Sequence, residues 1–416
     1  MNHIQTKEEN PRKETKETND EKFRQKAIAC ALYAIPKLGS RKLNRLTEYA
    51  LTPEGILKMR PSEAKEIIGS DLLSEVLTCY ENNPEELLRR MEQFYEEYVK
   101  DGINFVFIGE KEYPKKLLHL PDAPFGLFYK GSLPDEGRPA VSIIGARECS
   151  EYGRRCAELF GKVLGGNGVQ IISGMARGVD GISQSAALDV GGSSFGILGC
   201  GVDIIYPKEN RYLYENLCKN GGVISEYIPK TEAKSNLFPA RNRLISAFCD
   251  ILLVVEARKK SGTYITVCQA LEQGKEIFAI PGRITDALSD GCNSLIKDGA
   301  GMASDPESVL DALAAMGVWS EGDGAGSDGL TKDLRDPVTE EDNHSDGSSN
   351  GITGTRKALH SAILRVTEET PKPIEEIQVS LANLGIEISY ADLLCALTDL
   401  CISGKVEGLG NYYRKL

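Results

Sequence analysis

The sequence VQIISGMARGVD, residues 169–180, joins a short apolar run to a glycine-containing loop and leads into an amphipathic stretch. Runs of this kind recur between residues 139 and 300, at 141–144, 169–172, 195–198, 223–224, 251–255 and 276–280. Apolar runs that alternate with amphipathic stretches are typical of βαβ units, whose strands form a parallel sheet. We therefore predict an α/β fold in which an extended Rossmann-like parallel sheet forms the core.

The 416 residues are too many for one core, so several domains are expected. Residues 1–20 lack any apolar period and are predicted to be a disordered tail. Residues 21–104 have apolar residues at helical spacing, which predicts a helical domain, and residues 105–317 hold the Rossmann-like domain. Residues 318–354 are rich in Gly, Ser and Asp, which is typical of a linker, and residues 355–416 return to an ordered pattern.

The two outer domains contain features that are typical of DNA-binding modules. Residues 35–41 join two helices through a glycine turn, which fits either a helix-hairpin-helix module or a plain helix–helix turn. Helical patterns at 357–366, 374–384 and 390–403 precede a hairpin with a glycine turn at 405–413. This order predicts a winged-helix-like domain, whose ligand the sequence leaves open.

The net charge of −12 opposes nucleic-acid binding, but the charge is unevenly distributed. Residues 304–350 contain twelve acidic residues against Lys332 and Arg335, a balance of −10. Residues 138–300 contain 19 basic and 17 acidic residues, a balance of +2. The central domain is therefore compatible with an anionic ligand.

Each predicted strand is followed by a loop that combines glycines with a cation or a hydrogen-bonding side chain. In a parallel sheet the carboxyl ends of the strands lie at one edge, where ligands bind. The candidate ligand-binding residues in these loops are Arg147, Arg177, Lys208, Asn210, Arg241, Arg243, Ser261 and Thr263. The alternative is structural: the glycines only end strands, and Arg243 or Arg283 only pairs with Asp180 or Glu256.

Motifs for cofactor chemistry are absent from these loops. The first strand turn has the sequence GAREC (residues 145–149) in place of the dinucleotide fingerprint GxGxxG, and no Walker loop occurs. Residues 139–300 contain no histidine, and the eleven cysteines form no CxxC pair. We therefore predict no catalytic residue, no metal and no cofactor. Cations on several loops suit a ligand with several phosphates, and Phe238 and Tyr206 either stack on bases or are packed.

The sequence shows neither an export signal nor an apolar run long enough to span a membrane. We therefore expect a cytoplasmic protein without membrane contact.

Six motifs, at 145–153, 173–180, 206–210, 238–243, 261–263 and 281–282, resemble in order and spacing the signature of the DprA/Smf family. The resemblance covers residues 105–303. It implies a dimeric Rossmann-like protein that binds single-stranded DNA without a cofactor, protects incoming DNA during natural transformation and helps load RecA. By position, the pocket residues of the family correspond to Arg147, Arg177, Lys208, Asn210, Arg241 and Asn242, with Arg243, Ser261 and Thr263 as neighbours.

The sequence departs from the family pattern at Gln184, where members typically have a histidine. The departure matters little if this position packs, and more if it contacts DNA.

Two other functions remain open at this stage. One is a Rossmann enzyme of the phosphoribohydrolase type, although residues 259–266 lack the double glycine and the acidic residue of such enzymes. The other is a protein-interaction scaffold, which predicts that strand affinity survives loss of the arginines.

Overall fold

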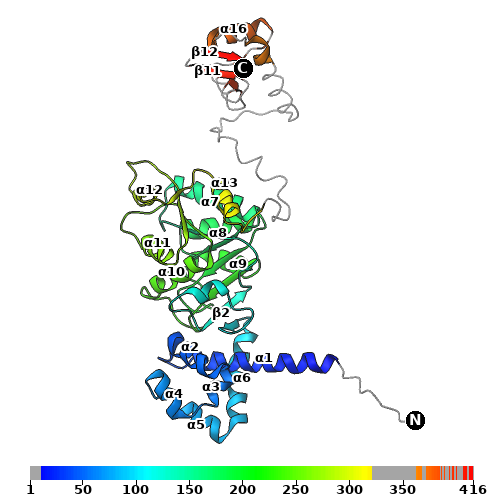
Figure 1. Cartoon of the computed structure of the whole chain (residues 1–416), viewed down its shortest axis with the longest axis vertical. Coiled ribbons are helices and arrows are strands. Elements are labelled where there is room, and N and C mark those ends of the chain that lie inside the picture. The colour runs from blue at the N-terminus through cyan, green and yellow to red at the C-terminus, as the bar shows by residue number, and fades with distance from the viewer. Residues whose placement is uncertain are drawn as a thin grey trace, which may run out of the picture. The chain divides into compact units, whose positions relative to one another are not determined.

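The computed structural model describes residues 11–320, 362–367, 372–384, 406–409 and 412–415, together with six single positions (386, 388, 393, 396, 397 and 400). The chain divides into two compact units, Met1–Asp336 and Pro337–Leu416 (Figure 1). Among the described residues, no helix combines the length and the apolar character that a membrane span needs.

Residues 104–302 form one nine-stranded sheet. The strands are β1 (Asn104–Phe107), β2 (Gly126–Gly131), β3 (Ala140–Ile144), β4 (Gln170–Ser173), β5 (Ser194–Ile197), β6 (Gly221–Ser225), β7 (Ile251–Val254), β8 (Glu276–Ala279) and β9 (Gly301–Met302). Their order is β1-β2-β6-β5-β4-β3-β7-β8-β9. The central strands and one edge of the sheet, in the order β6-β5-β4-β3-β7-β8-β9, are mutually parallel. At the other edge, β2 pairs antiparallel with β6, and β1 pairs antiparallel with β2. The predicted extended Rossmann-like α/β fold is confirmed.

The chain order places a switch point next to β3. From β3 the chain builds β4, β5 and β6 on one side, and then crosses to build β7, β8 and β9 on the other. At such a point the connections leave the sheet in opposite directions, and the crevice between them is the usual ligand site.

Helices cover both faces of the sheet because its strands are apolar on both sides. The helices are α7 (Glu151–Gly166), α8 (Val179–Asp189), α9 (Arg211–Leu217), α10 (Leu237–Phe248), α11 (Gly262–Glu272), α12 (Asp290–Lys297) and α13 (Pro306–Ala315). Ile143 and Leu253 pack into the core beneath α7 and α13, whereas Ile144 and Leu252 pack into the core beneath α10, α11 and α12. Successive strand residues thus serve opposite layers.

Six helices precede the sheet. They are α1 (Pro11–Tyr33), α2 (Gly39–Ala50), α3 (Pro53–Leu57), α4 (Pro61–Ile68), α5 (Ser74–Asn82) and α6 (Pro84–Lys100). Asn83 caps α6 by accepting a hydrogen bond from the Glu86 backbone N–H, and Gly69 ends α4 in a left-handed conformation. The predicted helical domain is confirmed as a set of helices.

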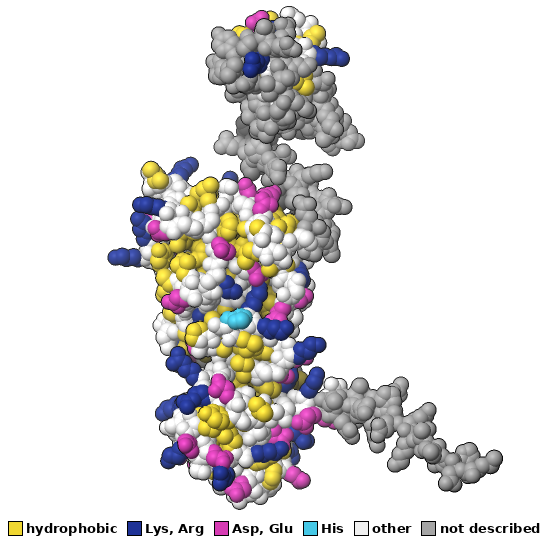
Figure 2. All heavy atoms as spheres, viewed as in Figure 1, with side chains coloured by type: hydrophobic (Ala, Val, Ile, Leu, Met, Phe, Trp, Pro, Cys, Tyr) yellow, Lys and Arg dark blue, Asp and Glu magenta, His cyan; other side chains and the backbone are white. Residues whose placement is uncertain are grey.

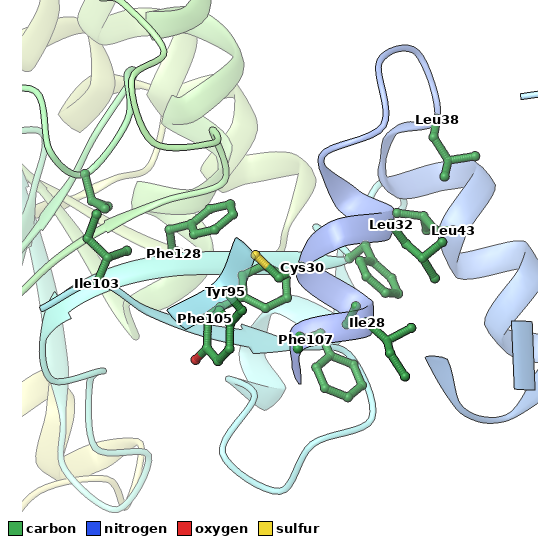
Figure 3. Packing of buried hydrophobic residues seen from close by; sticks show 14 of the residues in the cluster. Ile28, Cys30, Leu32, Leu38, Leu43, Tyr95, Ile103, Phe105, Phe107 and Phe128 are labelled. Atoms are coloured by element: carbon green, nitrogen blue, oxygen red, sulfur yellow. The ribbon is translucent and has the colours of Figure 1, made fainter. Parts of the chain in front are cut away.

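This helical region and the sheet share one hydrophobic core. Ile28 and Leu32 of α1 and Tyr95 of α6 belong to the same buried cluster as Phe105 and Phe128 of the first two strands (Figure 3). The predicted boundary at 104/105 coincides with the start of β1, but the residues on its two sides lie in one compact unit.

The predicted disordered tail needs a correction, because α1 begins at Pro11. Residues 11–20 extend a helix whose later turns are buried. Extending an existing helix adds a backbone hydrogen bond for each residue and avoids the cost of nucleating a new helix. An apolar period is not required for that extension. Residues 1–10 lie outside the described residues.

The C-terminal unit contains α16 (Ile374–Asn383) and the strands β10 (Lys372–Pro373), β11 (Val406–Leu409) and β12 (Tyr412–Lys415). The strands pair in the antiparallel order β10-β12-β11, which confirms the hairpin and adds a strand that the sequence did not predict. Residues 362–366 are also helical. Most of the predicted linker and much of the last predicted helix lie outside the described residues, so the winged-helix assignment stays a prediction.

Candidate functional site

Two adjoining pockets lie at the carboxyl ends of the central strands. The first, named here the Cys200 pocket, has a volume of about 310 Å³, and the second, named the Ser261 pocket, about 590 Å³. The residues that line both pockets are Arg147, Ala176, Tyr206, Phe238 and Arg241. The site therefore coincides with the switch point of the sheet.

An aromatic pair forms the ridge between the two pockets. The rings of Tyr206 and Phe238 stack with centroids 5.4 Å apart and an interplanar angle of 28°. The guanidinium carbons of Arg147 and Arg241 each lie 5.9 Å from the centroid of the Phe238 ring. Tyr206 remains 47% exposed, so the ridge presents both an aromatic surface and positive charge to a ligand.

The loop that carries Arg177 lies directly against the loop that carries Arg147. The Val179 backbone N–H donates to the Ala146 carbonyl oxygen at 3.2 Å. Gly178 has a φ of +72°, and a Cβ at this residue would be 2.3 Å from the Ala146 oxygen. Only glycine satisfies both the backbone conformation and this approach.

Asn210 and Gln184 both form hydrogen bonds with the backbone of the Arg177 loop. The Asn210 Nδ2 donates to the carbonyl oxygens of Met175 and Ala176 at 3.0 and 3.1 Å. The buried Gln184 accepts from the Met175 N–H at 3.1 Å and donates to the Phe195 carbonyl oxygen at 3.0 Å. Gln184 lines neither pocket and so has the packing role, and Asn210 fixes the loop instead of projecting from the rim.

Arg241 forms the floor of the site. It is 5% exposed, and its Nη1 donates to the carbonyl oxygens of Gly174 at 3.1 Å and of Ile197. Burial lowers the pKa of Arg241 to about 10 and raises the pKa of Asp180 above its ordinary value. A Cβ at Gly174 would be 2.7 Å from Asp180 Oδ2 and 2.8 Å from Arg241 Nη2, so glycine is needed there. Because a pKa of about 10 lies well above 7, the Arg241 side chain stays charged at neutral pH.

Three exposed cations stand around the Cys200 pocket: Arg147, Arg177 and Lys208. None of them forms an ion pair with any residue that the structure describes. Elsewhere, on the face shown in Figure 2, basic and acidic side chains are interspersed over the helical region and the sheet region. The three predicted cations are thus brought together at one rim and are free to meet an anion.

Arg243 is the exception among the predicted residues, because it lines neither pocket. Its Nε donates to Asp122 Oδ2 at 2.9 Å and its Nη2 to Glu226 Oε2 at 2.8 Å. Two positions along a helix rotate a side chain by about 200°, so Arg241 and Arg243 point to opposite sides of α10. Arg243 is ion-paired, with partners other than those the sequence offered, and its position beside a ligand stays a prediction.

Ser261, Thr263 and Asn242 line the Ser261 pocket, and their role toward a ligand stays a prediction. The Thr263 hydroxyl donates to the Gly145 carbonyl oxygen at 3.4 Å, which ties the start of α11 to the first loop. The Ser261 hydroxyl oxygen is enclosed and has no hydrogen-bond partner among the described residues.

The sixth loop, residues 281–283, does not reach either pocket. Its Pro281 carbonyl oxygen accepts from the Tyr152 hydroxyl at 2.7 Å. The alternative pairing of Arg283 with Glu256 also fails, because Glu256 accepts from the backbone N–H and the hydroxyl of Ser150 at the start of α7. Five of the six predicted loops therefore build the site.

The pocket-lining residues that were not among the predicted site residues include Cys200 and Ser235. Cys200 lies in the loop that follows β5, so its position was a usable signal, whereas Ser235 precedes α10 and had none. Burial raises the pKa of Cys200 to about 11, so its thiol is protonated at neutral pH. In the part of the chain that the structure describes, no cluster of three or more His, Cys, Asp or Glu side chains could hold a metal ion.

Residues 104–314 match the model of the family described as DNA recombination-mediator protein A. The DNA processing protein DprA of Streptococcus pneumoniae is 36% identical over 283 residues, which cover 66% of this chain and 98% of that protein. Protein Smf of Escherichia coli is 41% identical over 202 residues, covering 48% of this chain and 54% of that protein. The X-ray structure of the S. pneumoniae DprA superimposes with a TM-score of 0.56 at 31% identity, over 68% of this chain and 95% of that chain.

Proposed function

The chain belongs to the DNA recombination-mediator protein A family, and from that premise we propose that its two pockets bind single-stranded DNA. In this proposal the protein protects incoming DNA during natural transformation and helps load the RecA recombinase onto it. One observation carries the proposal: Arg147, Arg177 and Lys208 stand unpaired, within the described residues, around a hollow with an aromatic ridge.

The arrangement suits a polyanion with exposed bases. Each phosphate that meets a cation releases counterions, so three rim cations favour a chain of phosphates over a single one. The Tyr206–Phe238 pair offers a surface for base stacking, which is available on a single strand and not on a duplex. Single-stranded DNA therefore satisfies both features.

The proposed action is binding without chemistry on the strand. Two groups in the site that could act as nucleophile or base, Cys200 and Asp180, are unsuited to it. The Cys200 thiol is protonated at neutral pH, and the buried Asp180 carboxyl accepts from the Gly174 N–H beside Arg241. Release of ribose phosphate from nucleoside monophosphates would instead support the phosphoribohydrolase alternative.

The proposal is tested by fluorescence anisotropy on a labelled single strand and its duplex across a salt series. We expect the Arg177→Ala and Lys208→Ala variants each to bind the strand about fivefold to tenfold more weakly, with a salt slope smaller by about one. Lys219→Ala is the matched control, since Lys219 is exposed in the connection that precedes β6, at the opposite edge of the sheet. Equal binding of duplex, together with variants that match the wild type, would contradict the proposal.

We further propose that the protein acts as a homodimer, as the family resemblance implies. An exposed apolar stripe on α11 supports this: Ile265 is 42% exposed, Leu271 is 61% exposed, and Cys268 lies exposed between them. Light scattering on the wild type and on Leu271→Lys tests the dimer and its surface, and a monomeric wild type would refute it. RecA loading is tested separately, by RecA filament formation on coated strands with and without the protein.

A further inference from the structure

The N-terminal helical region presents a row of exposed cations that line neither pocket. Lys37 lies in the turn between α1 and α2, and Arg41 and Arg45 follow it at four-residue intervals along α2. None of the three forms an ion pair with any residue that the structure describes. Residues 35–51 contain four basic residues against one acidic residue, Glu48. This set of three, named here the α2 cation row, is therefore free to meet an anion.

The packing of α2 fixes the direction of the row. Leu43 and Leu46 are the buried residues of this helix. Residues four apart lie on the same side of a helix, so Arg41 and Arg45 share the side opposite the two leucines. Four helical residues rise by about 6 Å, which is close to the distance between neighbouring phosphates of an extended strand. The two arginines therefore present their charges at a spacing that suits a polynucleotide backbone.

The row lies near the edge of the sheet that carries the pockets. The Tyr33 hydroxyl donates to the Glu226 carbonyl oxygen at 2.8 Å and lies 3.4 Å from the Ser40 hydroxyl oxygen. This one side chain joins the start of α2 to the residue that follows the carboxyl end of β6. Asn44 of α2 adds a contact with the sheet region, because its Nδ2 donates to the Ala123 carbonyl oxygen at 2.9 Å. Figure 1 accordingly shows α2 on the side of the helical region nearest the sheet.

The loop of residues 226–236 connects the row with the Ser261 pocket. Ser235 near the end of the loop lines that pocket, and Ile228 near its start packs against the core of the helical region. Lys230 and Lys234 are exposed between them, with one exposed acidic residue, and neither lysine has an ion pair within the described part of the chain. Cations therefore extend from the pocket to α2 within one compact unit.

Tyr49 adds an aromatic surface at the end of the row. It follows Arg45 by four residues, so it lies on the same side of α2, and it is 67% exposed. An exposed ring offers a stacking partner to an unpaired base, whereas a duplex keeps its bases stacked inside. The row together with Tyr49 therefore suits a single strand better than a duplex.

We propose that the α2 cation row and Tyr49 form a second contact surface for single-stranded DNA, which binds the strand after it leaves the Ser261 pocket. This inference rests on the proposed strand binding by the pockets and adds a surface outside them. A short strand occupies the pockets alone, whereas a longer strand also reaches α2. The helical region thereby lengthens the bound stretch of strand and slows its dissociation.

The first experiment compares two strand lengths. Anisotropy is measured across a salt series on a strand of about six nucleotides and on one of about twenty, because single-strand sites usually span about 4–16 nucleotides. We expect Arg41→Ala/Arg45→Ala to bind the long strand about tenfold more weakly, with a salt slope smaller by about 1.4, since two phosphate contacts are lost. Its affinity for the short strand should equal that of the wild type.

Arg89→Ala/Arg90→Ala serves as the charge-matched control. It removes the same charge from the same helical region, but both arginines lie on α6 and pair with Glu86. This control should bind both strands like the wild type. A loss of long-strand affinity as large as that of Arg41→Ala/Arg45→Ala would show that net charge causes the effect, and would overturn the proposal.

The second experiment locates the strand on the surface. Long strands that carry one photoreactive 5-iodouracil, placed at a different position in each, are crosslinked to the full chain, and the modified peptides are identified by mass spectrometry. We expect labels at one end of the strand to crosslink to Tyr49, and labels farther along it to crosslink to Tyr206 in the pockets. Crosslinks to Tyr206 without any to Tyr49 would exclude the second surface.

The outcomes distinguish this inference from the proposed function. The second surface is refuted, while strand binding by the pockets stands, if Arg41→Ala/Arg45→Ala binds the long strand like the wild type. The same conclusion holds if this variant loses affinity only for a duplex of equal length. If the wild type binds neither strand at low salt, the proposed function itself fails.

Discussion

At the scale of single residues, the floor of the site is formed by three residues in close contact, so a substitution at one of them affects the other two. Gly174, Asp180 and Arg241 lie so close together that the glycine has no room for a side chain. Arg241 is charged although buried, because two carbonyl oxygens and a nearby carboxylate compensate for the lost water.

Gly174→Ala should lower the free energy of unfolding by about 1–3 kcal/mol and should weaken strand binding, because the added methyl group collides with Asp180 Oδ2 and Arg241 Nη2. Urea denaturation and anisotropy measure the two effects. Gly262→Ala is the control for stability, since nothing lies within 4 Å of a Cβ there. A Gly174→Ala variant as stable as this control would mean that the floor is more adaptable than the contacts indicate.

Cys200 should resist alkylation at pH 8, because burial raises its pKa to about 11 and only about one thiol in a thousand is then ionised. The exposed Cys79 is the internal reference. Peptide-level mass spectrometry after iodoacetamide treatment should show Cys200 labelling rise as the pH approaches 11. Labelling of Cys200 at pH 8 as fast as that of Cys79 would contradict the assigned burial.

At the scale of elements, α10 divides its two arginines between different tasks. Arg241 serves the pocket floor, whereas Arg243 binds Asp122, which precedes β2, and Glu226, which follows β6. Arg243 thus ties one side of α10 to the residues next to β2 and β6, whereas Arg241 on the other side brings its charge to the pocket floor.

Arg243→Ala should lower the free energy of unfolding by about 2–3 kcal/mol, because it leaves Glu226 nearly buried without its cation. Strand affinity per folded molecule should stay unchanged. Arg177→Ala should show the opposite pattern, with lost affinity and unchanged stability, because Arg177 is exposed and has no ion pair within the described residues. Loss of affinity in folded Arg243→Ala protein would return Arg243 to the site.

The sequence predicts part of this arrangement of loops and helices. Glycine loops after apolar runs predicted which strand ends meet, and Arg147, Arg177 and Lys208 were found at one rim. The direction of Arg243 was not predictable, because it depends on which face of α10 packs against the sheet. The burial of Arg241 and the internal hydrogen bonds of Asn210 depend on contacts between distant loops, which spacing along the chain does not reveal.

At the scale of the whole molecule, the N-terminal helices and the sheet are one structural unit. Tyr33 of α1 lies within 6.2 Å, between ring centroids, of Phe105, Phe125 and Phe128. The tyrosine hydroxyl also donates to the Glu226 carbonyl oxygen at 2.8 Å, next to the strand end of β6.

Ile28→Ala should destabilise both the helices and the sheet, by about 2–4 kcal/mol, because Ile28 is fully buried in their shared core. Circular dichroism and the strand-binding fraction should report the same denaturation midpoint. Two separate midpoints would show that the helices unfold independently.

Removal of residues 337–416 should leave the affinity for a single strand within about twofold, because both pockets lie in the first compact unit. Anisotropy on the shortened chain checks this. A larger loss would show that the C-terminal unit takes part in strand binding.

The contact between Gly178 and the Ala146 carbonyl oxygen has a practical consequence for engineering. A library that includes position 178 would mostly sample sequences in which a Cβ collides with the backbone oxygens of Ala146 and Arg147. Variants with altered ligand preference should therefore be sought by randomising either loop while Gly178 is held constant.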